Sequence, residues 1–361
     1  KLFASLMLAA LSLASFAGEN PASEEASKPW RSGWFAHWND PSGDDMIAAA
    51  KDLEFNALVV GGSFTPERMQ EFSLKAKKEG IDAYLWFFPM LPKDQDKDKF
   101  MQVMPEKDVK LLEKCKANKE WKKTLQGGGE PLPGYEEVHR KPLPCFHRKE
   151  VMDAMKDAIR EMIEKCPAMA GIAFDGFAYQ NFRNCVCEES LRQLGEFRKN
   201  NPSLSPEVSE EKFALESLVG AINELANFAR SLRPEIKTTI HVWPTYLPEP
   251  LYGNRLDLDY CAQTVAWFYQ PYWSDEKIAS YTRTVVQDEK KYFKRAKGIP
   301  FMGIYLGKKH TIDKPLDQFK KELKIIFENS YDTSFSVHEI ADIAFNPEYR
   351  KAFKEAVQQK K

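Results

Sequence analysis

The stretch from Ala168 to Asn184 contains the residue best placed to do chemistry, Asp175. The apolar run 170–174 has the length of a buried strand, and it ends in Asp175 followed by Gly176. In an eightfold β/α barrel, a residue at the end of a strand points into the mouth, where the loops that follow the strands build the active site. The prediction of an active-site acid therefore depends on whether the rest of the chain forms such a barrel.

Short β-rich segments alternate with helical segments along the rest of the chain. The helix signals are clear at 66–78, for example, where Pro66 stands at the first turn and Gly80 follows the end. Strands are predicted at 32–38, 56–61, 81–88, 170–174, 237–243, 260–268, 299–306 and 334–340. Helices are predicted at 44–53, 66–78, 149–164, 188–199, 210–231, 274–294, 316–329 and 347–358, with a further piece near 109–124.

This order of elements predicts an α/β fold, a (β/α)8 TIM barrel, because each connection is long enough for its two strands to pair in parallel. An open sheet that binds a dinucleotide is disfavoured. The segment Gly61-Gly62-Ser63 lacks the further glycines that a phosphate-binding fingerprint needs.

The domain organisation is predicted as follows. Residues 1–17 form a signal peptide, because the run 2–16 is apolar, uncharged and shorter than the ~20 residues that span a bilayer. Residues 18–29 are a linker, and 30–361 form a single barrel domain. Within it, 89–148 is a loop insertion at the barrel mouth, either a lid or subsite wall or a plain surface excursion. The expected location is secreted or periplasmic, without stable membrane association once the signal is cleaved.

The charges of the chain are balanced, with 52 basic and 53 acidic residues and a net charge of −1. No global field is therefore available to attract nucleic acid or an anionic membrane. Aromatic residues make up 12% of the chain, including eight tryptophans. Partners are expected to be recognised locally, and the aromatic residues favour a carbohydrate substrate.

Aromatic side chains are predicted to gather at the ends of the strands. Flat aromatic faces pack against the C–H groups of sugar rings, while polar neighbours bond to the hydroxyls. The alternative is that individual rings fill the layers of the barrel. The predicted substrate-binding residues are His37, Trp38, Trp86, Tyr179, His241, Trp243, Tyr269, Tyr272, Trp273, Tyr305 and His338.

Glycoside cleavage needs two carboxyl groups, one on each side of the scissile bond. Asp175 and Glu339, on the fourth and eighth predicted strands, are the best pair for catalysis. Asp275, Glu276 and Glu249 are alternatives for the second acid. Asp175 could instead only satisfy backbone amides in an Asp-Gly turn, and Glu339 could form a structural hydrogen bond.

The six cysteines are Cys115, Cys145, Cys166, Cys185, Cys187 and Cys261. In an exported chain they predict one to three disulfides of undetermined connectivity. The pair Cys185-Val186-Cys187 could instead be half of a metal site, but no nearby histidine completes it in the sequence, so no metal and no cofactor are expected. A nucleophile elbow, Gly-x-Ser-x-Gly, is absent from the sequence.

Two segments carry a family resemblance: SGWFAHW at 32–38 and GIAFDGFAYQNFRNCVC at 171–187. At these segments the sequence resembles secreted, glycoside-hydrolase-like barrels of polysaccharide-degrading bacteria, in which strand four carries a Gly-Ile-x-x-Asp-Gly type of segment. The resemblance implies a TIM barrel, a carbohydrate substrate and an acid role for the position of Asp175. An Asn-Glu pair ending strand four, a Glu ending strand seven and the Asp-x-x-Asp-x-Asp-x-Glu segment of chitinase-like barrels are all missing, so the resemblance assigns no second carboxylate.

The sequence thus predicts an exported glycoside hydrolase in which Asp175 and Glu339 act as the catalytic carboxyl groups. Two alternatives remain open. A carbohydrate-binding barrel without catalysis would keep the aromatic residues and need no second acid. A polysaccharide lyase would need Tyr179 or His241 as its base.

Overall fold

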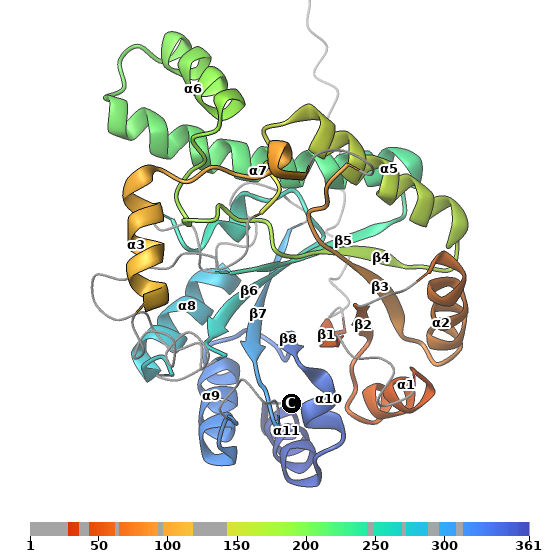
Figure 1. Ribbon diagram of the computed structural model, residues 1–361. Helices are drawn as coiled ribbons and strands as arrows, with labels where there is room; N and C mark the ends of the chain where they lie inside the picture. The colour runs from red at the N-terminus through yellow and green to blue at the C-terminus, as the bar shows by residue number, and fades with distance from the viewer. Residues whose placement is uncertain are drawn as a thin grey trace, which may run out of the picture.

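A computed structural model describes residues 28–35, 43–61, 65–92, 97–117, 143–243, 249–268, 272–287, 296–307 and 313–360. Its strands form one closed barrel in which every strand pairs in parallel with the next, and β1 pairs with β8 (Figure 1). The strands are β1 (Arg31–Phe35), β2 (Ala57–Val60), β3 (Asp82–Phe87), β4 (Gly171–Phe174), β5 (Lys237–Val242), β6 (Tyr260–Ala266), β7 (Lys297–Gly303) and β8 (Phe335–His338). The predicted (β/α)8 barrel is confirmed.

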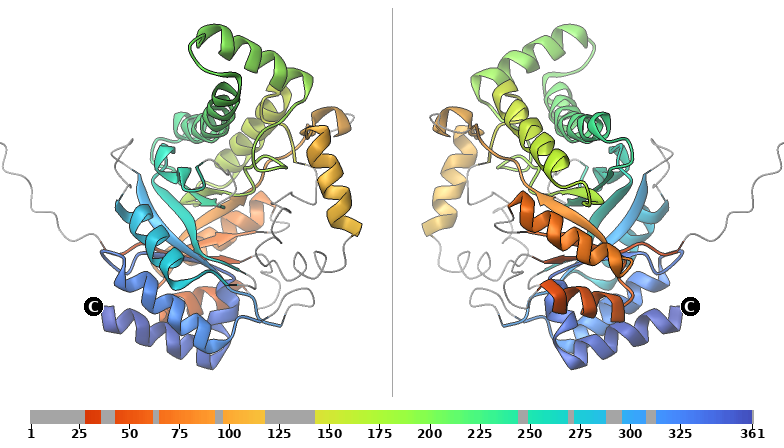
Figure 2. Two further views of the ribbon diagram at one scale, coloured as in Figure 1. Left: turned by 90° about the vertical axis from the view of Figure 1, so that its left-hand side faces the viewer. Right: turned by 90° about the vertical axis from the view of Figure 1, so that its right-hand side faces the viewer.

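The helices surround this barrel (Figure 1). They are α1 (Gly43–Asp52), α2 (Pro66–Lys78), α3 (Glu106–Ala117), α5 (Lys149–Lys165), α6 (Glu188–Asn200), α7 (Pro206–Leu232), α8 (Asp275–Gln287), α9 (Leu316–Glu328), α10 (Ile340–Ala344) and α11 (Pro347–Lys360). Helices α5 and α7 pack against each other, as do α9 and α11, and α6 extends outward beyond α7 (Figure 2). None of the helices in the described ranges is both long and apolar enough to cross a bilayer.

Strands β2 and β4 are apolar on both faces. All residues of β2 and β4 are buried, as expected for parallel strands covered by helices outside and by packed side chains inside. Gly171 opens β4 because space is lacking there: a Cβ atom would lie 2.3 Å from the ring of Tyr84 and 2.6 Å from the carbonyl oxygen of Lys237. The absence of a side chain at Gly171 thus lets β4 pair closely with β3 and β5, and Asp175 directly follows this strand.

Several boundaries differ from the prediction; strand β7, for example, is Lys297–Gly303 rather than 299–306. Helix α7 begins at Pro206 rather than 210, because the Ser205 side chain accepts a hydrogen bond from the Val208 amide and Pro206 fits the first helical turn. Strand β8 ends at His338, and the short helix α10 follows it, where a strand was predicted to continue to Ile340. Glu339 is therefore the residue between β8 and α10. The predicted signal peptide at 1–17 and most of the linker at 18–29 lie outside the described residues.

Candidate active site at the carboxyl ends of the strands

Asp175 follows β4 directly, at the carboxyl end of the barrel. Its amide donates to the Phe87 carbonyl oxygen at 2.9 Å, which continues the pairing of β4 with β3. The chain then turns at Gly176, whose φ of 72° lies in the left-handed region that favours glycine. Asp175 is only 4% exposed. The structure therefore places this acid at the predicted strand end, buried at the base of the mouth.

The carboxylate of Asp175 is held by N–H donors from three directions. Trp86 on β3 donates its indole N–H to Oδ2 at 2.9 Å, and Trp243, just after β5, donates to Oδ1 at 3.1 Å. The amide of Gly176 donates to Oδ1 at 2.7 Å. Because an ionised carboxylate is purely an acceptor, three N–H donors are its complement. The two indoles come from the strands on either side of β4, so the barrel itself fixes the orientation of this carboxylate.

His241 on β5 lies against the same carboxylate. Its Nδ1 is 3.4 Å from Asp175 Oδ1, and its Nε2 is 2.9 Å from the hydroxyl of Thr264 on β6. The imidazole also stacks on Phe301 of β7, with ring centroids 3.8 Å apart. A proton on Nδ1 lets the ring donate toward Asp175 while Nε2 accepts from Thr264. The ring orientation is thus set by β6 and β7.

Glu339 lies at the end of β8, and it is only 2% exposed. Its amide donates to the Ile304 carbonyl oxygen at 3.0 Å, and its Oε2 is 4.0 Å from Nε2 of His338. The His338 ring packs against the Trp86 ring, with centroids 5.2 Å apart. Trp86 therefore contacts both Asp175 and His338, the residue that precedes Glu339.

The ring of Tyr305 completes this side of the mouth, with its centroid 5.3 Å from that of His338. Trp86, His241 and Trp243 thus lie against Asp175, whereas His338 lies next to Glu339 and Tyr305 packs against His338. Three other predicted substrate-binding residues, His37, Trp38 and Tyr269, lie outside the described residues.

Tyr179 and Trp273 are placed elsewhere, which corrects their predicted position. Tyr179 donates to the Ala214 carbonyl oxygen of α7 at 2.8 Å and packs on Phe146. It points to the helix layer because the turn after Gly176 redirects the chain. Trp273 is buried and stacks on Trp267, which itself packs edge-on to Trp243. Trp267 therefore lies between Trp273 and Trp243, the tryptophan that bonds to Asp175.

Tyr272, another predicted sugar contact, packs beside Lys314, whose Nζ is 5.1 Å from the centre of its ring. Lys314 is fully buried and forms an ion pair with Glu322 of α9 at 2.5 Å. Burial lowers the pKa of Lys314, and the Glu322 carboxylate opposes that shift. The ammonium also donates to the Trp267 carbonyl oxygen at 2.8 Å. This buried pair ties the segment after β7 to the aromatic residues after β6.

Two of the three alternative second acids lie in ion pairs. Glu249 pairs with Arg255 at 2.6 Å, and Asp275 at the start of α8 pairs with Lys321 of α9 at 2.7 Å. Both pairs keep their carboxylates engaged by a cation. Glu276, beside Asp275 in the first turn of α8, is exposed. Of the four acids suggested as the second carboxyl group, Glu339 is the one that, like Asp175, is buried and directly follows a strand of the barrel.

Two residues near Asp175 were missed by the sequence analysis. Thr264 was overlooked because it is a small residue inside a predicted strand, although its alternation with Ala262 and Ala266 would have placed it on one face with them. Tyr252 is fully buried and directs its hydroxyl to the Phe177 carbonyl oxygen at 3.4 Å. Burial, together with the nearby Asp175 carboxylate, raises the pKa of this phenol.

The cysteines differ from their predicted state. Among the five whose side chains are described, none is in a disulfide. Cys145, Cys185 and Cys187 instead converge with His147 at the outer side of the β4–α6 connection, so a histidine does lie near the Cys185-Val186-Cys187 pair.

Comparison with solved structures finds similar barrels. A cold-adapted β-galactosidase from Rahnella sp. R3 shares 12% identity over 93% of this chain and 56% of its own, with a TM-score of 0.54. A β-galactosidase from the psychrophilic Marinomonas ef1 shares 10% identity over 91% of this chain and 59% of its own, with a TM-score of 0.52. The chain therefore spans less than two thirds of either enzyme, and at these identities the likeness shows the barrel fold.

No family model matches the sequence, and a search among curated proteins finds no match.

Proposed function

We propose that this protein is a glycoside hydrolase whose catalytic groups are the carboxyls of Asp175 and Glu339. The observation that carries the proposal is the Asp175 carboxylate, buried at the carboxyl end of the barrel and held between the indole N–H groups of Trp86 and Trp243. Active sites of TIM barrels lie at this end. The fold that the chain shares with two β-galactosidases is compatible with this chemistry.

The two carboxyl groups have different surroundings, which suggests different roles. Asp175 is bonded to three N–H donors, the pattern that an ionised carboxylate needs as a nucleophile or as the base that activates water. Glu339 is buried near the His338 ring, which itself packs against Tyr305, the kind of setting in which a carboxyl group can deliver a proton to a leaving oxygen. Asp175 thus takes the part of the carboxylate, and Glu339 that of the acid.

The aromatic side chains around the acids suit a sugar ring. Trp86, Trp243 and Tyr305 are partly buried, so each retains some exposed surface at the mouth. A sugar that packs on such surface would present its glycosidic oxygen to the acids below. The apolar segment near the start of the chain supports export of the protein, so we propose a polysaccharide or oligosaccharide substrate outside the cytoplasm.

The proposal is tested by incubating the purified protein with a panel of polysaccharides and aryl glycosides, β-galactosides included, and analysing the products by mass spectrometry. Hydrolysis adds one water to each cleaved bond, and such products are expected for at least one substrate. Unsaturated sugars without added water would show a lyase instead. Retention on a glycan column without any product would show a carbohydrate-binding barrel, and both results would overturn the proposal.

A further inference from the structure

The thiol cluster, which we define as Cys145, Cys185, Cys187 and the imidazole of His147, lies outside the proposed active site. Cys145 Sγ is 3.8 Å from Cys185 Sγ, 3.6 Å from Cys187 Sγ and 3.8 Å from His147 Nδ1. Cys145, His147 and Cys185 also satisfy the spacing of a metal-binding group, with their ligand atoms all within 4.8 Å of one another. All four side chains are buried. Three thiols and one imidazole thus share a small volume closed to solvent.

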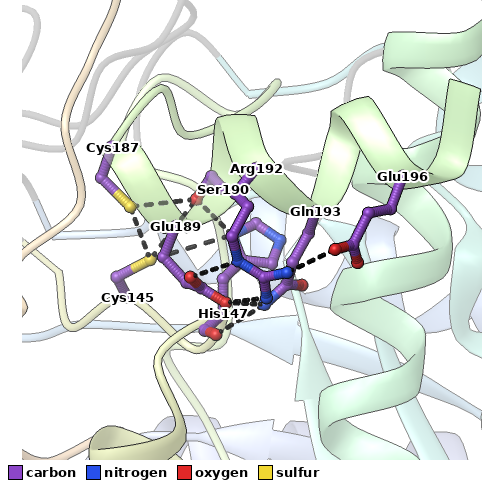
Figure 3. Close-up of polar contacts among 8 residues, drawn as sticks. All are labelled: Cys145, His147, Cys187, Glu189, Ser190, Arg192, Gln193 and Glu196. Carbon is purple, nitrogen blue, oxygen red and sulfur yellow. Dashed lines mark hydrogen bonds and ion pairs between the residues drawn. The ribbon is translucent and has the colours of Figure 1, made fainter.

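The cluster is built from two parts of the chain. Cys145 and His147 precede α5, whereas Cys185 and Cys187 end the segment that begins at Asp175 and leads into α6. Figure 3 shows Cys145 and His147 facing Cys187 and Ser190 at the start of α6. A link through these side chains would therefore join the segment before α5 to the connection between β4 and α6.

The distances from Cys145 to the other three ligand atoms fit a tetrahedral zinc ion, whereas Cys187 Sγ does not lie within 4.8 Å of all the others and has to move toward the ion on binding. Bonds of about 2.3 Å from zinc to sulfur and about 2.0 to 2.1 Å to nitrogen give tetrahedral edges of roughly 3.8 Å between sulfurs and roughly 3.6 Å between sulfur and nitrogen. The three distances from Cys145 are 3.8, 3.6 and 3.8 Å. A disulfide would need about 2.05 Å between two sulfurs and would leave the third thiol unused.

The groups around the cluster are those that metal-bound thiolates and imidazoles require. Cys185 Sγ accepts from the amides of Val103, at 3.3 Å, and Cys187, at 3.5 Å. Cys187 occupies the N-cap position of α6, where the helix dipole favours a thiolate.

His147 is also held on its far side. Its Nε2 is 3.4 Å from the hydroxyl of Tyr179, which donates in turn to the Ala214 carbonyl oxygen at 2.8 Å. A histidine that binds metal through one ring nitrogen commonly uses the other in such a bond. Tyr179 therefore leaves Nδ1 facing the sulfurs.

We propose that Cys145, Cys185, Cys187 and His147 bind one structural zinc ion, with His147 Nδ1 as the fourth ligand. Binding forms three Zn–S bonds and one Zn–N bond and releases the protons of the thiols to solvent, without any change of oxidation state. The Ser190 hydroxyl, 2.6 Å from Nδ1 and 3.1 Å from Cys187 Sγ, then bonds to the sulfur alone. The zinc fastens the far end of the segment that begins at Asp175. This proposal does not depend on the hydrolase function.

The test measures the zinc content of the full chain after saturation with Zn²⁺ and dialysis. One zinc per chain is expected for the natural protein and for the control variant Cys166→Ser. Cys166 is a matched control because it is buried outside the thiol cluster, where its thiol donates a hydrogen bond to the Pro66 carbonyl oxygen. Cys145→Ser and Cys187→Ser should lose the metal. His147→Ala should bind it at least tenfold more weakly, whereas Ser190→Ala should bind it almost as well as the natural protein.

Cobalt substitution of the natural protein keeps the test valid if a variant does not fold. Tetrahedral Co²⁺ with thiolate ligands gives intense visible bands and a near-ultraviolet charge-transfer band, which are expected here. A chain that retains no metal after saturation would overturn the proposal, as would a disulfide between two of the three thiols found by mass spectrometry. Unchanged affinity in His147→Ala with loss in Ser190→Ala would overturn the assignment of the fourth ligand.

Discussion

The surroundings of Asp175 and the thiol cluster lie at the two ends of one chain segment, yet they are built in different ways. Asp175 is held by Trp86 on β3 and by Trp243, the residue directly after β5, so the two indoles come from the strands on either side of β4. Cys185 and Cys187 meet Cys145 and His147, which come from a separate connection outside the barrel. Residues on and next to the barrel strands position Asp175, whereas the connection between β4 and α6 is held by contacts with another connection, through the thiol cluster.

Because of this difference, we expect substitutions in one region to affect catalysis and substitutions in the other to affect the stability of the fold. Changes around the acids should reduce turnover and leave the melting temperature nearly unchanged. Changes in the thiol cluster should act first on stability.

The largest effect is expected for Glu339→Gln, which keeps the size of a buried side chain and removes its acidic proton. The value of kcat should fall roughly 10²- to 10⁴-fold on a natural glycan. On an aryl glycoside with an acidic leaving group the loss should be much smaller, because that group leaves without protonation. Steady-state kinetics on both substrates measure this difference, and equal losses on the two would contradict the acid role of Glu339.

Cys145→Ser should lower the melting temperature by about 3 to 4 °C, which for a domain of this size corresponds to a loss of roughly 2 to 3 kcal/mol. A chelator should lower the melting temperature of the natural protein by a similar amount and leave that of the variant unchanged. Differential scanning calorimetry gives both values, with Cys166→Ser as the control. If the chelator shifts the variant as much as the natural protein, its effect does not arise from the thiol cluster.

Trp86→Phe should reduce kcat/KM about tenfold, since the substitution removes one hydrogen bond to the Asp175 carboxylate and retains an aromatic ring. Trp30→Phe is the matched control, because Trp30 precedes β1 at the opposite end of the barrel and stacks on Tyr260. The control should keep full activity. Equal losses in the two variants would mean that the indole of Trp86 acts through general packing.

The smallest effect is expected for Thr264→Val. The hydroxyl that bonds to His241 Nε2 is lost, so the ring is less well oriented beside Asp175, and kcat/KM should fall about threefold. Thr282→Val on α8 removes a comparable buried hydroxyl outside the site, bonded to the Ile278 carbonyl oxygen, and should have no effect on kcat/KM. A fall in kcat/KM greater than that of Trp86→Phe would mean that the orientation of His241 contributes more to catalysis than the hydrogen bond from Trp86.

Most of the fold could be predicted because strand and helix periods are local properties of the sequence. The acid Asp175 was found in the same way, since an apolar run that ends in Asp-Gly marks a strand end. Tyr179 was misplaced because a positive φ at Gly176 redirects the chain, and nothing in the local pattern reveals the new direction. The thiol cluster was missed because His147 meets Cys185 only through the packing of two connections. The length of a strand could be read from the sequence, but not the path of a loop.

The most direct test of the proposed function is kcat/KM for Asp175→Asn on the substrate found in the panel, measured together with the melting temperature. Asp82→Asn, the same change at the start of β3 and the opposite end of the barrel, is the control. The predicted result is a fall of at least roughly 10²-fold for Asp175→Asn, with full activity in the control and similar melting temperatures for both. Unchanged turnover in a folded Asp175→Asn protein would contradict the assignment of Asp175.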